Sequence, residues 1–133
     1  MKSQELKIMN CKLDDMFQKR LTYIQMMQGM RPGSYPAFPL DMKSKESQQV
    51  CRDLALRGVE EMFEALQHLK NWKPHRITEV KEDINKEEFL EEIVDAFNYF
   101  FSLLIVVGFN EKDLHEAYLK KDTIIRERLE NGY

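Results

Sequence analysis

Apolar residues recur every three to four positions along most of the chain, and no stretch alternates apolar and polar residues as a half-buried strand does. This spacing predicts four helices, over residues 4–28, 44–70, 85–108 and 110–129. Ser44 can cap the second helix, and Asn85-x-x-Glu88 forms a capping-box pattern that opens the third. We therefore expect an all-α fold, a bundle of four to five helices that forms a single domain over residues 1–133.

The segment between the first two helices, residues 30–43, holds three prolines together with Tyr35 and Phe38. Its aromatic residues favour an ordered strap that lies against the body, because a flexible linker would contain fewer of them. In the second helix, Gly58 interrupts the apolar side, and its missing side chain allows a neighbouring helix to approach closely.

The third helix is apolar nearly all round from residue 96 to residue 107, which predicts burial on every side. Four helices in a chain of 133 residues cannot wrap one of their own on all sides. We therefore expect a self-complementary two-fold interface and a homodimer or higher homo-oligomer.

Composition and charge exclude several classes of partner. The formal net charge is −3, so no basic field recruits nucleic acid. The longest apolar stretch, near residues 96–109, is too short for a membrane span, and the N-terminus lacks the apolar run of a signal peptide. Cys11 and Cys51 are isolated and form no CxxC, which favours reduced thiols in a cytoplasmic protein.

Two acidic patterns, Glu61-x-x-Glu64 and Glu92-x-x-Asp95, lie inside the second and third helices. Positions three apart share a helix face, so each pattern directs two carboxylates the same way. If the helices pack side by side, four carboxylates converge and need a cation between them. Hard divalent cations prefer such an oxygen shell, which predicts Mg²⁺, with Mn²⁺ as an alternative.

Each acidic pair taken alone also fits a solvated surface in a chain with 23 acidic residues. The register favours the metal site, because Glu61 projects inside the edge of the apolar arc, and Glu92 and Asp95 share a stripe that continues into the apolar segment 96–107. As the most enclosed acid, Glu61 is also the candidate base that orients water. A ferritin-like di-iron centre is disfavoured, because it needs Glu-x-x-His on two helices and the chain has none.

Two groups of cations each have two explanations. Lys70 and Lys73 flank Trp72, where they either stabilise the end of the second helix or bind phosphates. Lys121 and Arg128 fall on the apolar stripe of the last helix, where they either extend past it to water or meet a polyanion or an acidic helix.

Taken in order, these motifs resemble those of the all-α nucleotide pyrophosphatases, that is, the dimeric dUTPases and their MazG-like relatives. The resemblance is carried by Glu61-x-x-Glu64, Leu-Lys-Asn-Trp-Lys at 69–73, and Glu92-x-x-Asp95. It extends to Phe17-Gln18-x-x-Leu21 in the first helix and to Tyr118-x-x-Lys121, Arg128 and Gly132-Tyr133 at the end of the chain.

The resemblance implies an α-helical dimer that hydrolyses a nucleoside triphosphate, typically dUTP, to the monophosphate and pyrophosphate, with Mg²⁺ on the four acids. It implies a substrate site in which the glutamine is associated with the base and the cations and terminal tyrosine engage phosphates: Gln18, Lys70, Trp72, Lys73, Asn98, Tyr118, Lys121, Arg128 and Tyr133.

Two positions depart from the dUTPase pattern, which usually has histidine at Asn98 and asparagine at Ile125. The base therefore stays open, and a MazG-like pyrophosphatase for dCTP or a modified nucleotide is the alternative. The remaining alternative is a non-enzymatic helical dimer, in which the acidic residues serve only solubility.

Overall fold

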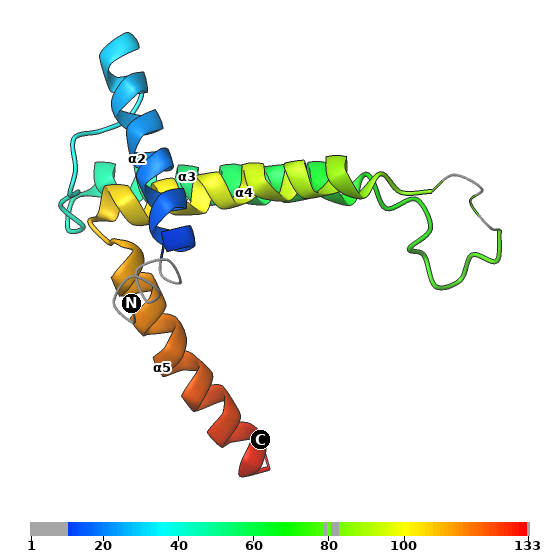
Figure 1. Cartoon of the computed structure of the whole chain (residues 1–133). Helices are drawn as coiled ribbons and strands as arrows, with labels where there is room; N and C mark the ends of the chain where they lie inside the picture. Colours follow the sequence, from blue (N-terminus) through cyan, green and yellow to red (C-terminus); the bar gives the residue numbers. More distant parts are fainter. Residues whose placement is uncertain (1–10, 79, 81–82, 133) are drawn as a thin grey trace, which may run out of the picture. The chain divides into compact units, whose positions relative to one another are not determined.

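The structure of the protein is a computed structural model, and it describes residues 11–78, 80 and 83–132 (Figure 1). Within these residues the chain forms four helices and no strand: α2 (Cys11–Met30), α3 (Lys45–Leu66), α4 (Lys86–Val107) and α5 (Glu111–Glu130). The all-α prediction is thereby confirmed. Residues 4–10 of the predicted first helix, and Tyr133 of the predicted substrate site, lie outside the described residues.

The predicted starts of the second, third and last helices are confirmed by their caps. Ser44 Oγ accepts a hydrogen bond from the Ser47 amide at 3.0 Å, and Asn85 Oδ1 accepts from two amides of the first turn of α4 at 3.1 Å each. Asn110 and Asp113 form a reciprocal capping box at the start of α5, with both bonds at 2.9 Å. These side chains satisfy amides that have no partner within their own helix.

The predicted end of the second helix is wrong by four residues, because α3 ends at Leu66 and not at Lys70. The amides of Gln67, His68 and Leu69 each bond to the carbonyl three residues earlier, at 3.2, 3.1 and 3.0 Å. Such bonds tighten the last turn and end an α-helix.

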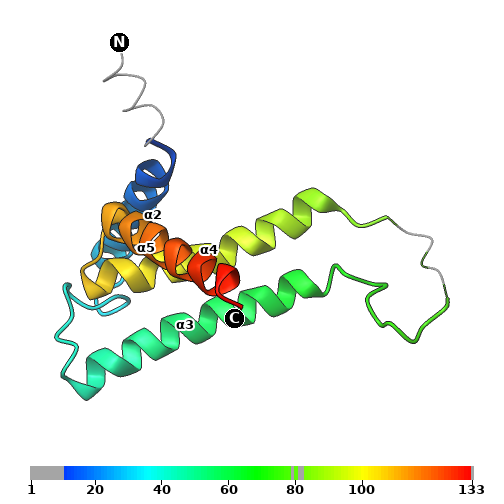
Figure 2. The same ribbon diagram turned by 90° about the horizontal axis from the view of Figure 1, so that it is seen from below.

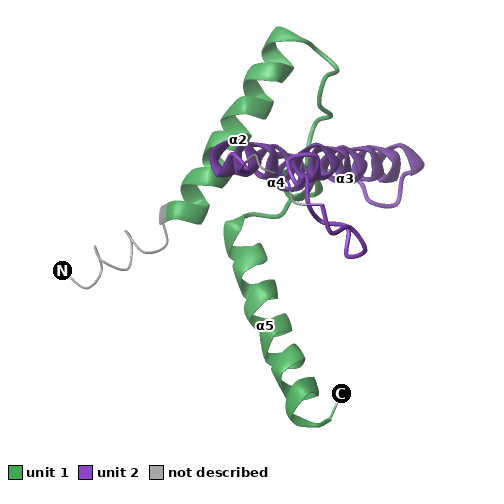
Figure 3. Cartoon of the chain, turned by 90° about the vertical axis from the view of Figure 1, so that its right-hand side faces the viewer, with its two compact units in different colours: residues 1–40, 104–133 green, residues 41–103 purple. Residues whose placement is uncertain are grey.

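The chain divides into two compact units (Figure 3). Unit 1 comprises residues 1–40 and 104–133, and its described part contains α2, the strap, the last residues of α4, and α5. Unit 2 comprises residues 41–103 and contains α3 with most of α4.

In unit 1 the proline-rich strap is tied to its surroundings, as predicted. Gln28 Nε2 on α2 donates to the Pro36 carbonyl at 2.9 Å, and the Leu40 amide donates to the Val106 carbonyl at 2.9 Å. On α2, Phe17 is buried, and α2 contacts α5.

In unit 2, α3 and α4 run antiparallel, side by side, and their contact depends on Gly58 (Figure 2). A Cβ atom at Gly58 would meet the Phe100 ring, with Cζ at 2.8 Å and Cδ1 at 2.9 Å. The predicted close approach of a helix to Gly58 is confirmed, and this contact fixes the level of one helix against the other.

Burial along the third helix is less complete than predicted. Ala96, Ser102 and Val106 are buried, but Phe97 is 52% exposed in the single chain. No single helix in the described part of the chain is long and apolar enough to cross a membrane, and only α4 and α5 together, as a bent pair, meet the criteria of length and composition.

Candidate metal centre

Three of the four predicted acids converge in unit 2. Glu61 on α3 and Glu92 and Asp95 on α4 each offer a carboxylate oxygen, and these oxygens all lie within 4.8 Å of one another. The Gly58–Phe100 contact explains the convergence, because it sets Glu61, three residues along α3, level with the middle of α4, where Asp95 lies. The two helices therefore contribute to one acidic cluster, which we define as Glu61, Glu92 and Asp95.

The fourth acid, Glu64, adjoins the acidic cluster without joining its closest group. Its negative charge helps to raise the pKa of both Glu61 and Glu92. Glu61 and Glu92 are half-buried, whereas Asp95 and Glu64 are exposed. Glu61 was predicted to be the most enclosed of the four acids. It is only half-buried, and Glu92 is half-buried as well.

The pKa values of Glu61 and Glu92 are both raised above the ordinary value of a glutamate. Loss of hydration is the largest cause for each, and repulsion from Glu64 and Asp95 follows. For Glu92, His68 acts in the opposite direction and lowers the pKa. An arrangement that penalises its own negative charge is one that a bound cation would relieve.

An arginine on α3, one turn before Glu61, was not identified from the sequence. Arg57 Nε donates to Asp53 Oδ2 at 2.9 Å within α3. Its pKa is raised first by a hydrogen bond with Tyr99 on α4 and next by the charge of Asp53. The four-residue spacing of Asp53 and Arg57 was visible in the sequence as an ordinary helix-surface pair, but its partner across the helices was not.

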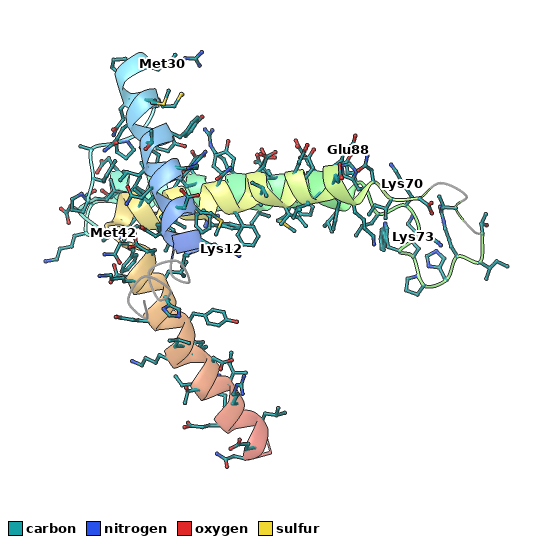
Figure 4. The ribbon with its side chains drawn as sticks, in the orientation of Figure 1. Lys12, Met30, Met42, Lys70, Lys73 and Glu88 are labelled. Atoms are coloured by element: carbon teal, nitrogen blue, oxygen red, sulfur yellow. The ribbon has the colours of Figure 1, made fainter. Side chains whose placement is uncertain are left out.

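A pocket of about 680 Å³ lies at the loop end of unit 2. It is lined by residues that follow α3 and precede α4: Gln67, His68, Leu69, Lys70, Asn71, Trp72, Val80, Asp83, Ile84, Asn85 and Glu88. Figure 4 shows Lys70 and Glu88 at the same end of the helix pair, with Lys73 farther along the loop. Lys73 Nζ lies 5.7 Å from the centre of the Trp72 ring, and that ring is 65% exposed.

The helix-end explanation for Lys70 and Lys73 is weakened by the position of these residues. Because α3 ends at Leu66, its last turn contains no basic residue, and both lysines follow the helix. The interaction of a cation with a helix terminus falls off within the last turn. The helix-end explanation therefore does not apply to either lysine, and of the two only Lys70 lines the pocket.

The other predicted substrate residues fall in different parts of the chain. Asn98 is half-buried on α4 in unit 2. The rest of the described ones belong to unit 1 and are exposed: Gln18 on α2, and Tyr118, Lys121 and Arg128 on α5. The predicted apolar stripe of the last helix is also open, since Tyr118 is 69% and Ile125 is 53% exposed.

Comparison with known proteins found no family model, no curated protein and no solved structure that matches the chain. Only the residues of the site and their geometry therefore bear on its function.

Proposed function

We propose that the protein is a Mg²⁺-dependent nucleoside triphosphate pyrophosphohydrolase, with dUTP as the expected substrate and dUMP and pyrophosphate as products. The observation that carries the proposal is the convergence of Glu61, Glu92 and Asp95 from two helices, with carboxylate oxygens within 4.8 Å of one another. Another deoxynucleoside triphosphate, such as dCTP or a modified nucleotide, is the alternative substrate.

The residues fit a hard divalent cation. All the donors are carboxylate oxygens, the class of ligand that Mg²⁺ and Mn²⁺ prefer, and Glu64 adds a fourth next to the acidic cluster. Mg²⁺ is commonly held by few carboxylates together with substrate phosphates, which suits a cluster that is partly open. When bound, the ion supplies neutralisation of the phosphate charge and a more acidic water.

Residues of the protein itself would act as the general base and bind the nucleoside. Glu61 is half-buried, and its raised pKa makes it a better proton acceptor than an ordinary surface glutamate, so we assign it the proton of the attacking water. The water oxygen then bonds to the α-phosphorus, and pyrophosphate leaves. The pocket beside Trp72 is of a size that suits a nucleoside, and an exposed indole offers a base a face to stack on.

Pyrophosphate release from a panel of deoxynucleoside triphosphates, with and without Mg²⁺, tests the proposal. Glu61→Gln keeps the shape of the side chain and should lower the rate by at least about 100-fold, the contribution of a positioned general base. Glu60→Gln is the matched control, because Glu60 is the exposed neighbour and lies outside the acidic cluster. Absence of release with every nucleotide tested would contradict the proposed function.

A second candidate is a non-enzymatic helical protein that acts through its apolar surface. On the flank of the helix pair opposite the acids lies an apolar face, which we define as Leu56, Val59, Phe63 and Leu66 of α3 with Leu90, Val94 and Phe97 of α4. Each of these side chains is between 43% and 60% exposed. At 100° per residue they fall on the far side of each helix from its acids.

We assign a second copy of this chain to the apolar face. Its seven apolar side chains, each at least 43% exposed, exceed the scattered single apolar residues that are usual on a monomer surface. A two-fold axis through such a face would bury the same patch of both copies against each other and leave both acidic clusters open. A dimer is compatible with both the pyrophosphohydrolase and the non-enzymatic protein. The pyrophosphate assay distinguishes these two functions.

A further inference from the structure

Asn85 caps α4 and also belongs to the wall of the pocket at the loop end of unit 2. Its Oδ1 atom accepts hydrogen bonds from the amides of Glu87 and Glu88, at 3.1 Å each. A backbone amide can only donate, so these two bonds identify the atom that faces the helix as the oxygen. The orientation of the amide group is therefore fixed, with Nδ2 as its other end.

The Nδ2 atom of Asn85 has two N–H donors and accepts no hydrogen bond. Within the described part of the chain it donates to no protein atom, and the residue is exposed. The side chain cannot turn over without losing both bonds to the helix, because an N–H group in place of the oxygen would face two other donors. The wall of the pocket therefore contains a hydrogen-bond donor whose identity the cap determines.

The indole of Trp72 lines the same pocket and is 65% exposed. A base that stacks on an indole leaves its own edge, which has the carbonyl and amino groups, free for hydrogen bonds with other residues. Every base has a face that can stack, so stacking alone distinguishes the bases poorly. Trp72 can therefore hold a base without selecting it, and selection depends on polar groups of the wall such as Asn85.

We infer that Asn85 donates a hydrogen bond from Nδ2 to a carbonyl oxygen of the bound base, and that this bond favours uracil or thymine over cytosine. The inference rests on the proposed function and adds the residue that selects the base. Uracil and thymine have a carbonyl group on each edge of the ring beside N3, so either edge can accept from Asn85. Cytosine has an amino group on one of these edges, which would leave two donors facing each other.

Quenching of indole fluorescence by dUMP and dCMP tests base binding without catalysis, because Trp72 is the only tryptophan in the chain. Wild type should bind dUMP about 10-fold more tightly than dCMP, the effect of one hydrogen bond made in place of a buried donor left unpaired. Asn85→Asp keeps an oxygen for the cap and replaces the donor with an acceptor. This variant should reverse the order and bind dCMP more tightly than dUMP.

Two variants control for charge and for capping. Asn71→Asp adds the same charge to the wall of the pocket, where it should weaken both nucleotides alike and leave the ratio of their dissociation constants unchanged. Asn110→Asp makes the same substitution at the cap of α5, outside the pocket lining, and should change neither affinity. If Asn85 serves only as a helix cap, Asn85→Asp should also keep the wild-type ratio, because aspartate caps a helix as well as asparagine does.

Pyrophosphate release distinguishes failure of this inference from failure of the proposed function. If wild type releases pyrophosphate but prefers dCMP, or if Asn85→Asp keeps the wild-type ratio of affinities, the role of Asn85 is refuted and the proposed function stands. If Asn85→Asp reverses the ratio while no triphosphate yields pyrophosphate, Asn85 selects the base and the hydrolysis is wrong. If neither nucleotide quenches the fluorescence of Trp72, the pocket is not the base site and the inference is refuted.

Discussion

The ring of Phe100 on α4 lies directly over the backbone of Gly58 on α3, where a Cβ atom would come within 3.0 Å of three ring atoms. This contact is in the middle of unit 2, between residues that are buried on both helices, Leu54 and Ala96 among them. It sets the spacing and the level of the two helices, and with them the distance between Glu61 and Asp95.

Gly58→Ala should therefore destabilise the protein by about 1–3 kcal/mol, because the added methyl group would overlap the Phe100 ring and force it to shift. Urea unfolding followed by circular dichroism measures the change. The same variant should also lose affinity for Mg²⁺, since separating the helices separates the acids.

Gly29→Ala is the control for the effect of the residue type. Gly29 also lies in a helix, and nothing lies within 4 Å of a Cβ built there. Alanine at such a position should stabilise the protein by about 0.4–1 kcal/mol by restricting the unfolded chain. If both variants changed stability in the same direction, the Gly58–Phe100 contact would not be the cause.

Most of the fold follows from local patterns in the sequence. Helical spacing and polar caps such as Ser44 predict the helices and their starts, because both act within a few residues. The end of α3 was misplaced because it depends on three-residue bonds at Gln67 to Leu69, and no strong breaker stands there. Pro74, the nearest proline, comes eight residues after Leu66.

The candidate site was predictable as far as helix faces decide it. A three-residue spacing is enough to place Glu92 and Asp95 on one face, and the structure brings Glu61 to them. The membership of the cluster, with Asp95 inside it and Glu64 outside, was not predictable, because it depends on the level of α3 against α4. That level is set by a contact between residues more than 40 positions apart in the chain, for which periodicity carries no information.

Divalent cations should stabilise the folded protein, because they relieve repulsion between carboxylates that the unfolded chain does not bring together. At about 100 times the dissociation constant the stabilisation is about 2.7 kcal/mol, roughly 10 °C in melting temperature for a domain of this size. Scanning calorimetry with Mg²⁺, Mn²⁺ or EDTA measures it. Asp95→Asn should flatten the response, and a wild type indifferent to these ions even with nucleotide present would exclude the metal centre.

Stability without metal should fall as the pH rises through the range in which Glu61 and Glu92 ionise. Their pKa values are higher in the folded protein than in the unfolded chain, mainly because of lost hydration. Between the two values the folded state binds more protons, so each upward step in pH favours unfolding. The loss begins near the ordinary glutamate pKa and is complete above the raised one.

Urea unfolding in EDTA from about pH 4 to about pH 8 tests this sign. Other carboxylates also titrate there, so the informative quantity is the difference between wild type and Glu61→Gln/Glu92→Gln. The double variant should gain stability relative to wild type as the pH rises. Parallel curves for the two proteins would show that folding does not raise the pKa values of these two acids.

The apolar face predicts an oligomer, which light scattering at micromolar concentration measures directly. Phe63→Glu and Phe97→Glu place a charge in the centre of this face and should shift the dimer toward monomer, because burying an unpaired carboxylate is costly. Ile77→Glu is the control, since Ile77 is 96% exposed in the loop and lies outside the apolar face. A monomeric wild type would refute the second copy as its occupant.

Two cations of α5, Lys121 and Arg128, either bind phosphate groups of the substrate or are ordinary surface charges, and substitution distinguishes these two roles. Lys121→Met and Arg128→Met keep most of the length of each side chain and remove its charge. If both residues engage the substrate, each variant should fold normally and bind nucleotide with a loss of about 1.5–3 kcal/mol. If they only extend an apolar stripe into water, methionine is well tolerated and turnover stays unchanged.

The chain offers two close controls for this comparison. Lys120 is the exposed neighbour of Lys121, and Arg126 lies two residues before Arg128 in a 2.9 Å pair with Asp122. Lys120→Met and Arg126→Met should leave nucleotide affinity within about twofold of wild type, as for ordinary surface charges. Equal losses in all four variants would indicate a general effect of charge. Losses confined to Lys121 and Arg128 would place α5 at the substrate, because neighbouring charges on the same helix share every long-range effect and differ only in direct contact.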